Sequence, residues 1–403
     1  MSRIRIGRRA ALAGGVAAFA GPAVLRAQSA PSGADPIRLA TLTPLTGAGG
    51  SYGPVMAKVA ASVVEEVNKA GGVLGRRVVL VSEDDQTSPE AGVRAARKLI
   101  DVDKVAAIMG TWASSVTTAV APLCWESKTF LCTVSGADSI TLLPHQGFLV
   151  RTQPNSTLQV TRVGEFILSL GAKKVFTMIP QTPFTQSTFD ILNAVLPKGG
   201  ATHQSLIYDD KKTTYRTEVD QALRTSPDVI LANGYTPDSI VLLKDLYRAG
   251  FKGKILGFAY SINQKLIDQI GQPEVVEGVY TFAPSPAEGS TAYEKVKAAV
   301  GSANPDPYTC QVYDHTNMVL MSMAFAKAAT GEAIKDSIRK VTQGGGKTVD
   351  NAVDGIKAIA AGDKVDYSGA SGPCDFDARG DILDCKFRYE QIKAGKFTLV
   401  KIA

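Results

Sequence analysis

The sequence predicts an α/β fold made of two similar Rossmann-like lobes, each a parallel sheet flanked by helices. Short apolar runs alternate with longer amphipathic ones along most of the chain, and this alternation is typical of parallel sheets covered by helices on both faces. It occurs in two runs of about 120 residues that meet near residue 151, and each run has the size of an ordinary domain. The composition, with 45% hydrophobic and 20% charged residues, is normal for a packed globular protein.

The first run predicts strands at 37–42, 77–81, 105–109 and 129–134, with helices over 55–70, from 88 and from 114. Gly71-Gly72 ends the first helix. Ser88-Pro89-Glu90 is a helix start, because Ser caps the first turn, Pro fits its backbone and Glu lies at the positive end of the helix dipole.

The second run predicts helices over 157–169, 186–196, 214–224 and 239–248, with strands at 174–179, 204–208, 228–232 and 254–257. Beyond Pro284 the pattern is mostly helical, over 287–300, 310–329, 334–340 and 349–360, and it closes with strands at 385–391 and 397–402. This tail is too short to form a third domain, so we expect it to complete the first two lobes.

Residues 1–27 have the order of a secretory signal peptide: a basic head, a short apolar core over 10–25 and a small-residue cleavage site at Leu25-Arg26-Ala27. The pair Arg8-Arg9 raises the twin-arginine variant, and an uncleaved N-terminal anchor is the alternative. No later apolar run approaches membrane-spanning length. We therefore expect a soluble periplasmic protein that is cleaved near Ala27.

Removal of this segment changes the charge balance of the chain. It carries five arginines (3, 5, 8, 9 and 26) and no acidic residue, so the net charge falls from +6 to +1. A mature chain that is nearly neutral argues against a nucleic-acid partner. The three histidines (145, 203 and 315) are far apart and no Cys-x-x-Cys occurs, so we expect neither a metal site nor a cofactor.

The chain has five cysteines: Cys124, Cys132, Cys310, Cys374 and Cys385. An exported protein can form disulfides, and the odd number leaves at least one thiol free or paired between chains. Cys374 and Cys385 flank Ala378-Arg379-Gly380-Asp381, which predicts a hairpin turn, so we expect these two to pair. The state of the other three stays open.

Two loops compete as the functional site. Gly49-Gly50-Ser51-Tyr52-Gly53 matches the Gly-x-Ser-x-Gly pattern of serine hydrolases, but the flexible segment 43–50 separates Ser51 from its strand, whereas a nucleophile elbow needs the serine directly after the strand. The second loop, residues 110–115, follows the strand ending at Met109 and opens a helix. Its glycine, Trp112, Ser114 and Ser115 fit an anion site at the carboxyl end of a strand.

Other loops at the ends of the predicted strands are rich in aromatic residues and poor in catalytic ones. Aromatic side chains that converge on one cleft suit the enclosure of a small ligand. The loop residues that we expect there are Tyr52, Ala137, Asp138, Phe184, Tyr235 and Tyr260.

Three segments resemble the leucine/isoleucine/valine-type periplasmic solute-binding proteins of ABC importers, which have the type I periplasmic binding protein fold. They are IRLATLTPLTGAGGSYG (37–53), NKAGGVLGRRVVLVSEDDQTSPEAGVRAARKLI (68–100) and SGPCDFDARGDILDCKFRYEQIKAGKFTLV (371–400). The resemblance implies two lobes joined by three crossover hinge strands. An N-terminal lobe would comprise 36–153 plus 284–360, and a C-terminal lobe 154–283 plus 361–403.

The resemblance also implies a binding protein rather than an enzyme. Such a protein would work as a monomer and deliver its ligand to an inner-membrane ABC permease. Carried over by position, Ser114, Ser115 and the segment Ala137-Asp138 would hold a ligand carboxylate. Tyr52 would lie against the ligand side chain, and Phe184 and Tyr235 would close over it. An exported serine hydrolase using Ser51, or a binding protein that reports to a receptor, are the alternatives.

The departures from the family pattern concern the ligand. Where amino-acid binders carry an acid for the ligand ammonium group, this chain has Ala259-Tyr260-Ser261, and an unpaired buried ammonium group would be costly. Phe184-Thr185 stands where the family has Tyr-Gly. The sequence therefore predicts a carboxylic acid with an apolar or aromatic body. A branched-chain amino acid stays open, with Asp138 as the candidate partner for its amine.

Overall fold

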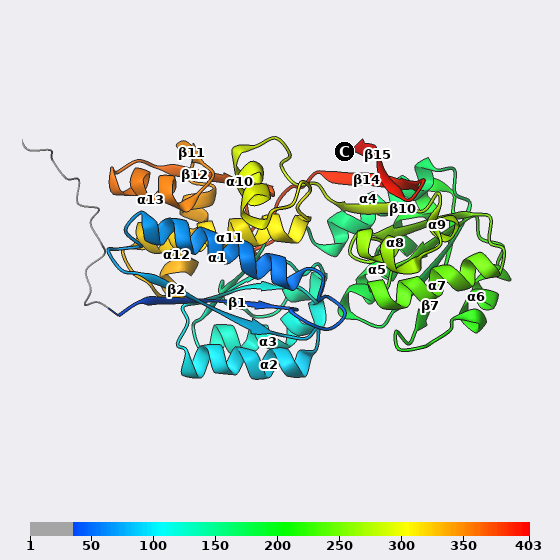
Figure 1. Ribbon diagram of the computed structural model, residues 1–403, viewed down its shortest axis with the longest axis horizontal. Helices are drawn as coiled ribbons and strands as arrows, with labels where there is room; N and C mark the ends of the chain where they lie inside the picture. Colours follow the sequence, from blue (N-terminus) through cyan, green and yellow to red (C-terminus); the bar gives the residue numbers. More distant parts are fainter. Residues whose placement is uncertain (1–34) are drawn as a thin grey trace, which may run out of the picture.

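The computed structural model describes residues 35–403 and shows two α/β lobes side by side (Figure 1). The expected signal peptide, residues 1–27, lies outside the described residues. Among residues 35–403, no helix is both long enough and apolar enough to cross a membrane.

The first lobe is built on a five-stranded sheet with the order β2-β1-β3-β4-β5, in which all neighbours are parallel. Its strands are β1 (Ile37–Thr43), β2 (Val78–Asp84), β3 (Ala107–Thr111), β4 (Phe130–Thr133) and β5 (Leu149–Arg151). The helical segments that connect them are α1 (Gly53–Lys69), α2 (Pro89–Arg97), η1 (Lys98–Val102), α3 (Ser114–Glu126) and η2 (Asp138–Ile140). The expected cap of α2 is present, since the amide N–H of Ala91 donates to Ser88 Oγ.

The second lobe carries a seven-stranded sheet with the order β15-β14-β10-β9-β8-β6-β7. Its strands are β6 (Lys174–Pro180), β7 (Thr202–Tyr208), β8 (Val229–Ala232), β9 (Lys254–Phe258), β10 (Tyr280–Pro284), β14 (Phe387–Lys393) and β15 (Lys396–Ile402). Its helical segments are α4 (Ser156–Ser169), α5 (Pro183–Val195), η3 (Pro197–Gly199), α6 (Arg216–Leu223), α7 (Thr236–Arg248), α8 (Gln264–Ile270) and α9 (Pro273–Val276). Strand β14 is antiparallel to both of its neighbours, β10 and β15, and the other neighbouring strands of this sheet are parallel.

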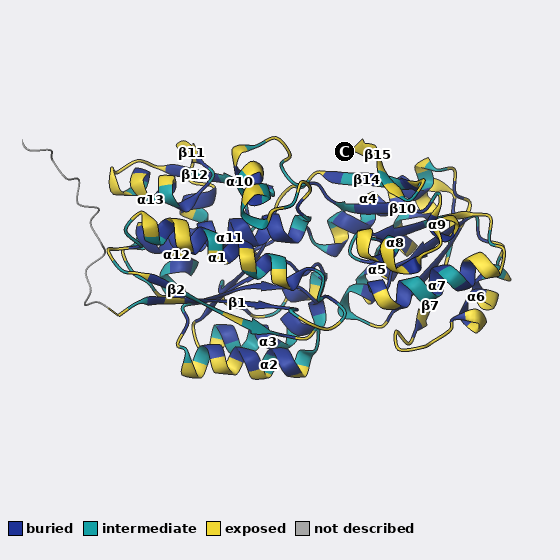
Figure 2. Ribbon diagram, in the orientation of Figure 1, coloured by how far each residue is buried: buried dark blue, intermediate teal, exposed yellow. Residues whose placement is uncertain are grey.

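After β10 the chain returns to the first lobe. It adds α10 (Thr291–Val300), α11 (Pro307–Ala326), α12 (Gly331–Thr342) and α13 (Ala352–Ala360), and a small sheet of β11 (Lys347–Val349), β12 (Val365–Gly369) and β13 (Gly372–Pro373). Helix α11 packs on α1, α12 and α13, and its residues from Tyr308 to Ala324 are all buried (Figure 2). A helix that is covered all round holds this third segment firmly to the first lobe.

The boundary expected at residue 360 differs from the packing. Val365, Tyr367, Phe376 and Ile382 belong to the same apolar core as the first sheet, and the chain reaches the second sheet only at Phe387, where β14 pairs with β10. The segment 361–382 therefore packs with the first lobe, because its apolar residues fill the space beside α11 and α12. Three connections join the lobes, between β5 and α4, between β10 and α10, and before β14.

The expected disulfide between Cys374 and Cys385 is not present, and all five cysteines are free thiols. The hairpin does form, with Phe376 opposite Ile382. The pairing ends there, since Leu383 lies in a bend and residues 384–386 are not part of a strand. The two thiols point to different backbone groups, Cys374 Sγ to the carbonyl oxygen of Gly372 and Cys385 Sγ to that of Lys386.

Candidate ligand site

A cavity of about 60 Å³ lies between the lobes, at the carboxyl ends of β3, β4, β6, β8 and β9. This is the edge at which open α/β sheets bind ligands. The residues around it come from both lobes and from the first crossover: Trp112, Ala113, Ser114, Val134, Gly136, Gln153, Gln159, Ile179, Pro180, Thr182, Phe184, Asn233, Gly234, Tyr235, Tyr260 and Tyr308.

The N-terminus of α3 supplies unpaired hydrogen-bond donors at this cavity. The helix has Ala113 as its N-cap and no side chain that caps its first turn, so the N–H groups of Ser114, Ser115 and Val116 have no partner within the helix. The Ser114 hydroxyl accepts a hydrogen bond from the Ala137 N–H at 3.2 Å and keeps its own proton to donate. By contrast, Thr182 caps α5 and Asp238 caps α7. An anion at the cavity therefore finds its best site at α3.

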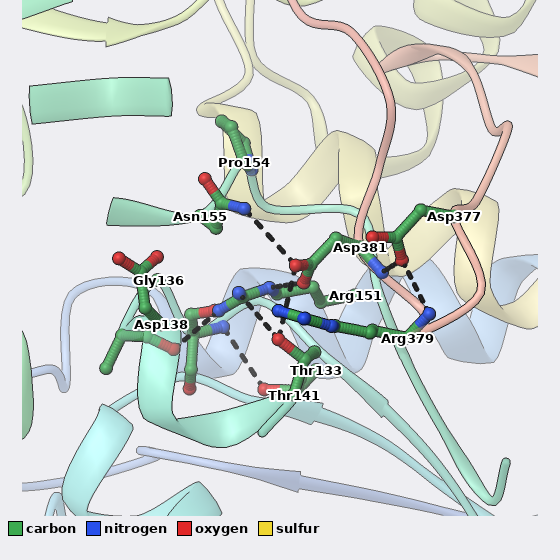
Figure 3. A network of polar contacts seen from close by, with 12 residues as sticks. Thr133, Gly136, Asp138, Thr141, Arg151, Pro154, Asn155, Asp377, Arg379 and Asp381 are labelled. Carbon is green, nitrogen blue, oxygen red and sulfur yellow. Dashed lines mark hydrogen bonds and ion pairs between the residues drawn. The ribbon is translucent and has the colours of Figure 1, made fainter. Parts of the chain in front are cut away.

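Arg151 fixes the loop that faces α3 (Figure 3). The Arg151 side chain is fully buried, and its guanidinium donates to the carbonyl oxygens of Ala137 at 2.7 Å and Ser135 at 3.3 Å. Its Nε forms an ion pair with Asp381 Oδ1 at 2.5 Å, and Asp381 Oδ2 accepts from Asn155 Nδ2 at 3.2 Å. The network thus ties the loop before η2 to the first crossover and to the hairpin over 376–382.

Aromatic rings from both lobes form the walls of the cavity. Trp112, in the first lobe, lies 5.7 Å from Tyr235 and 5.9 Å from Tyr260 of the second lobe, measured between ring centroids. Tyr308, at the start of α11, packs edge-on against Trp112 at 5.8 Å. Phe184 faces Tyr260 in an edge-to-face arrangement at 6.5 Å. Such an enclosure favours a small ligand with a flat apolar body.

Three amide side chains line the cavity, and each already uses its oxygen. Asn233 Oδ1 accepts from the Phe258 N–H, Gln159 Oε1 from Gln153, and Gln153 Oε1 from Gln311. The orientation of two of these amides is set by the backbone, since the Gln159 amide donates to the carbonyl oxygen of Pro154 and Asn233 accepts from a backbone N–H. Each oxygen thus already accepts one hydrogen bond, and the remaining amide hydrogens can be donated to a ligand.

No Asp, Glu, Lys or Arg is among the residues that line the cavity within residues 35–403. Asp238 is the acid behind Gly234, but its Oδ2 accepts from the Tyr208 hydroxyl at 2.6 Å and its Oδ1 from the Tyr235 N–H. Burial raises the pKa of Asp238 to about 6. A Cβ at Gly234 would lie 1.7 Å from Asp238 Oδ2, so glycine at this position lets the backbone pass over the carboxyl group.

Only some of the site residues predicted from the sequence line the cavity. Trp112, Ser114, Phe184, Tyr235 and Tyr260 line the cavity together. The others lie beside it or elsewhere. Ala137 contacts Ser114, and Ser115 is not part of the lining.

Two of the predicted site residues, Tyr52 and Asp138, make their contacts outside the cavity. Tyr52 stacks behind Trp112 at 5.5 Å and faces an open groove along the hinge. The Asp138 carboxylate accepts hydrogen bonds from the N–H and hydroxyl of Thr157 at the start of α4. These bonds connect η2, which contains Asp138, to the helix that follows the first crossover. Asp138 is therefore not placed to receive a ligand amine.

Several polar and aromatic residues of the lining were not predicted from the sequence, among them Tyr308, Gln153, Gln159 and Asn233. Gln153 and Gln159 belong to the first crossover and the helix after it, and Tyr308 comes from a distant segment that folds back onto the first lobe. Asn233 could have been predicted, because it directly follows the predicted strand over 228–232 and lies two residues before the expected site residue Tyr235.

Ser51 has no catalytic partner among residues 35–403. It lies eight residues beyond β1, in the turn before α1, and lines the hinge groove rather than the central cavity. The three histidines bond elsewhere: His145 to the Gly147 N–H, His203 to Thr177 and Asn193, and His315 to Thr152.

Residues 36–393 match the sequence model of a family described as periplasmic binding protein. The chain belongs to the periplasmic binding protein family. It is 25% identical over 300 residues to an amino acid binding protein of Pseudomonas aeruginosa, covering 72% of this chain and 79% of that protein. It is 26% identical to a substrate-binding protein of a chemotactic signal transduction system, BasB, of Halobacterium salinarum, covering 85% of this chain and 84% of the relative.

Solved structures of this periplasmic binding protein fold match most of the chain. A leucine binding protein, LivK, from Thermotoga maritima aligns with a TM-score of 0.77 at 22% identity, covering 91% of this chain and 98% of that one. A solute-binding protein of an ABC transporter from R. palustris, in complex with benzoate, aligns with a TM-score of 0.73 at 15% identity, covering 91% and 96%. At these identities the matches establish the type I periplasmic binding protein fold.

Proposed function

We propose that this periplasmic binding protein captures an amine-free carboxylic acid with an aromatic or apolar body and delivers it to an inner-membrane ABC permease. The observation that carries the proposal is the character of the cavity: aromatic walls, an uncapped helix N-terminus, and no acidic side chain in the lining that the described part of the chain forms. The protein then acts as an exported, monomeric carrier that performs no chemistry on its ligand.

The carboxylate belongs at the N-terminus of α3. The unpaired N–H groups there and the free proton of the Ser114 hydroxyl match a carboxylate with charge-assisted hydrogen bonds, each worth about 1.5–3 kcal/mol. The loop of Ala137 lies against Ser114 and is held by Arg151, so the donors are positioned before the ligand arrives. Such preorganisation reduces the entropy lost on binding.

Among residues 35–403, no carboxylate lines the cavity to pair with an ammonium group. A buried ammonium group needs acceptor oxygens or a carboxylate. The amide oxygens of Asn233, Gln153 and Gln159 are already engaged, and Asp238 is committed to Tyr208 and to the backbone. This is why we favour an amine-free acid over leucine, isoleucine or valine. Structural neighbours from Rhodopseudomonas palustris in complex with benzoate and with 3,4-dihydroxybenzoic acid support this ligand class.

A thermal-shift screen tests the proposal, because a ligand that binds only the folded state raises its melting temperature. The panel contains benzoate, 3-phenylpropanoate, 4-methylpentanoate, benzamide and the branched-chain amino acids. We expect the amine-free acids to raise the melting temperature and the amide and amino acids to leave it unchanged. The Ser114→Ala variant should lose the shift, whereas Ser205→Ala, at an exposed site on β7, should keep it. A shift with leucine but with none of the acids would refute the proposal.

A role in sensing is a second candidate, because the relative from Halobacterium salinarum belongs to a chemotactic signal transduction system. The same cavity would then present its ligand to a receptor instead of a permease. Uptake of the radiolabelled acid by cells with and without the gene separates the two roles: loss of uptake identifies transport, and loss of chemotaxis with normal uptake identifies sensing.

A further inference from the structure

We propose that the Tyr260 hydroxyl, oriented by Asn233, is a second polar subsite that takes an uncharged oxygen acceptor of the ligand. The ligand would then be a monocarboxylate that carries a hydroxyl or carbonyl oxygen on the part facing the second lobe. This inference rests on the proposed function and narrows it from aromatic or apolar acids to acids with one such oxygen.

The orientation of Asn233 decides which way the hydrogen bonds run. Asn233 Oδ1 accepts from the backbone N–H of Phe258 at 3.2 Å, so its Nδ2 faces Tyr260. That Nδ2 donates to the Tyr260 hydroxyl oxygen at 2.8 Å. The hydroxyl therefore acts as acceptor toward Asn233, and its own proton is directed to another group.

Within residues 35–403, no protein acceptor takes that proton. The neighbours of the Tyr260 ring are themselves aromatic, with Phe258 at 5.7 Å, Trp112 at 5.9 Å, Tyr235 at 6.4 Å and Phe184 at 6.5 Å between centroids. Burial raises the pKa of Tyr260 well above its ordinary value, so the hydroxyl stays protonated and remains a donor. Tyr260 is half-buried, and a ligand oxygen that accepts its proton adds a hydrogen bond which the free protein lacks.

The chemistry of the subsite excludes charged groups. A second carboxylate would lack a counter-ion, since no Lys or Arg of residues 35–403 lines the cavity. A charged amine would meet no carboxylate in the lining described for residues 35–403, and the oxygens of Tyr260, Asn233 and Gln159 each already accept one hydrogen bond. An uncharged hydroxyl or carbonyl oxygen can accept from Tyr260 without either penalty.

Titration calorimetry with benzoate, 3-hydroxybenzoate and 4-hydroxybenzoate tests the inference. It is carried out on the wild-type protein, on Tyr260→Phe and on Tyr280→Phe. Tyr280→Phe is the control, because the Tyr280 ring packs on Phe166 outside the cavity. In the wild type, we expect at least one hydroxybenzoate to bind about five- to tenfold more tightly than benzoate, which is the range of one neutral hydrogen bond. In Tyr260→Phe that preference should fall to within about twofold, while Tyr280→Phe should keep it. Measurable benzoate binding by Tyr260→Phe shows that the cavity still forms.

The outcomes separate the two proposals. Equal binding of benzoate and both hydroxybenzoates by the wild type would overturn the subsite while leaving the carboxylate site standing. A preference that survives in Tyr260→Phe would also overturn it, because another group would then hold the hydroxyl. Failure of all three acids to bind would overturn both the subsite and the proposed function.

Discussion

Tyr52 of the first lobe and Asn263 of the second lobe are joined by a hydrogen bond across the cleft: Asn263 Nδ2 donates to the Tyr52 hydroxyl at 2.9 Å. The same hydroxyl donates to the carbonyl oxygen of Ala259 at 3.2 Å. The Tyr52 ring stacks on Trp112, which forms a wall of the ligand cavity. Tyr52 therefore connects the cavity wall to the opposite lobe without lining the cavity itself.

Replacement of Tyr52 by phenylalanine should weaken ligand binding through lobe closure. The ring and its stacking on Trp112 remain, but the two bonds to the second lobe are lost, so we expect benzoate affinity to fall about two- to tenfold, corresponding to roughly 0.5–1.5 kcal/mol. Stopped-flow kinetics should place the loss in the dissociation rate. Tyr247→Phe, at an exposed position on α7, serves as the control. Unchanged dissociation in Tyr52→Phe would contradict this role.

Ser114→Ala and Ser115→Ala should differ although the residues are adjacent. The Ser114 hydroxyl lines the cavity and contacts the Ala137 loop, whereas Ser115 is outside the lining. Loss of a hydrogen bond to a charged group should lower benzoate affinity about 10- to 100-fold in Ser114→Ala. Ser115→Ala retains the same backbone N–H groups, and its affinity should change less than threefold. Calorimetry on both variants checks this, and equal losses would show that the carboxylate lies between the two serines.

Removal of one partner of the buried ion pair between Arg151 and Asp381 should destabilise the protein strongly. Asp381→Ala leaves an unpaired buried guanidinium, and we expect the free energy of unfolding to fall by about 3–5 kcal/mol. Removal of both charges in Arg151→Met/Asp381→Ala should cost less than the sum of the single changes. Urea unfolding measures all three. The exposed pair Lys69–Glu65 is the matched control, and Glu65→Ala should have little effect on stability. Additive losses in the double variant would argue against coupling.

His315 should make the protein less stable in acid. It is buried on α11, bonds to Thr152 through Nε2 at 2.8 Å and has no partner for Nδ1 within residues 35–403. Burial lowers the pKa of His315 to about 3. Between pH 6.5 and 3 the unfolded chain takes up a proton that the folded protein does not, so the free energy of unfolding falls as the pH falls.

The His315→Gln variant isolates this contribution. The stability of the wild type relative to the variant should decrease by about 2–3 kcal/mol between pH 7 and pH 4.5, as measured by urea unfolding. Buried Asp314, whose pKa burial raises to about 6, contributes with the opposite sign and is present in both proteins, so it cancels in the comparison. A difference that does not change with pH would show that His315 titrates normally.

The order of helices and strands was predictable because each segment carries its own signal. Apolar runs such as that over 228–232 and caps such as Ser88 are local features of the sequence. The segment 361–382 was placed in the wrong lobe because its position depends on packing against α11 and α12, which no local pattern records. The missing disulfide has a similar cause, since the sequence predicts the turn but not where the pairing beside it ends.

The candidate site was predictable where it follows strand ends and not where it depends on orientation. Trp112, Ser114 and Tyr235 lie directly after strands, so the topology alone brings them to one edge. Asp138 also follows a strand, but its carboxylate turns to Thr157 instead of the cavity. The hydrogen bonds that the amide oxygens of the lining accept could not be predicted from the sequence, because they depend on the three-dimensional arrangement of the side chains.

The most direct test compares leucine with 4-methylpentanoate, two acids that differ only in the amino group. Calorimetry on the purified protein measures the dissociation constant of each. Because the cavity offers a carboxylate site but, among residues 35–403, no acidic side chain for an ammonium group, 4-methylpentanoate should bind at least about tenfold more tightly than leucine, a difference of roughly 1.4 kcal/mol or more. Tighter binding of leucine would contradict the account and show that an ammonium site exists within this cavity.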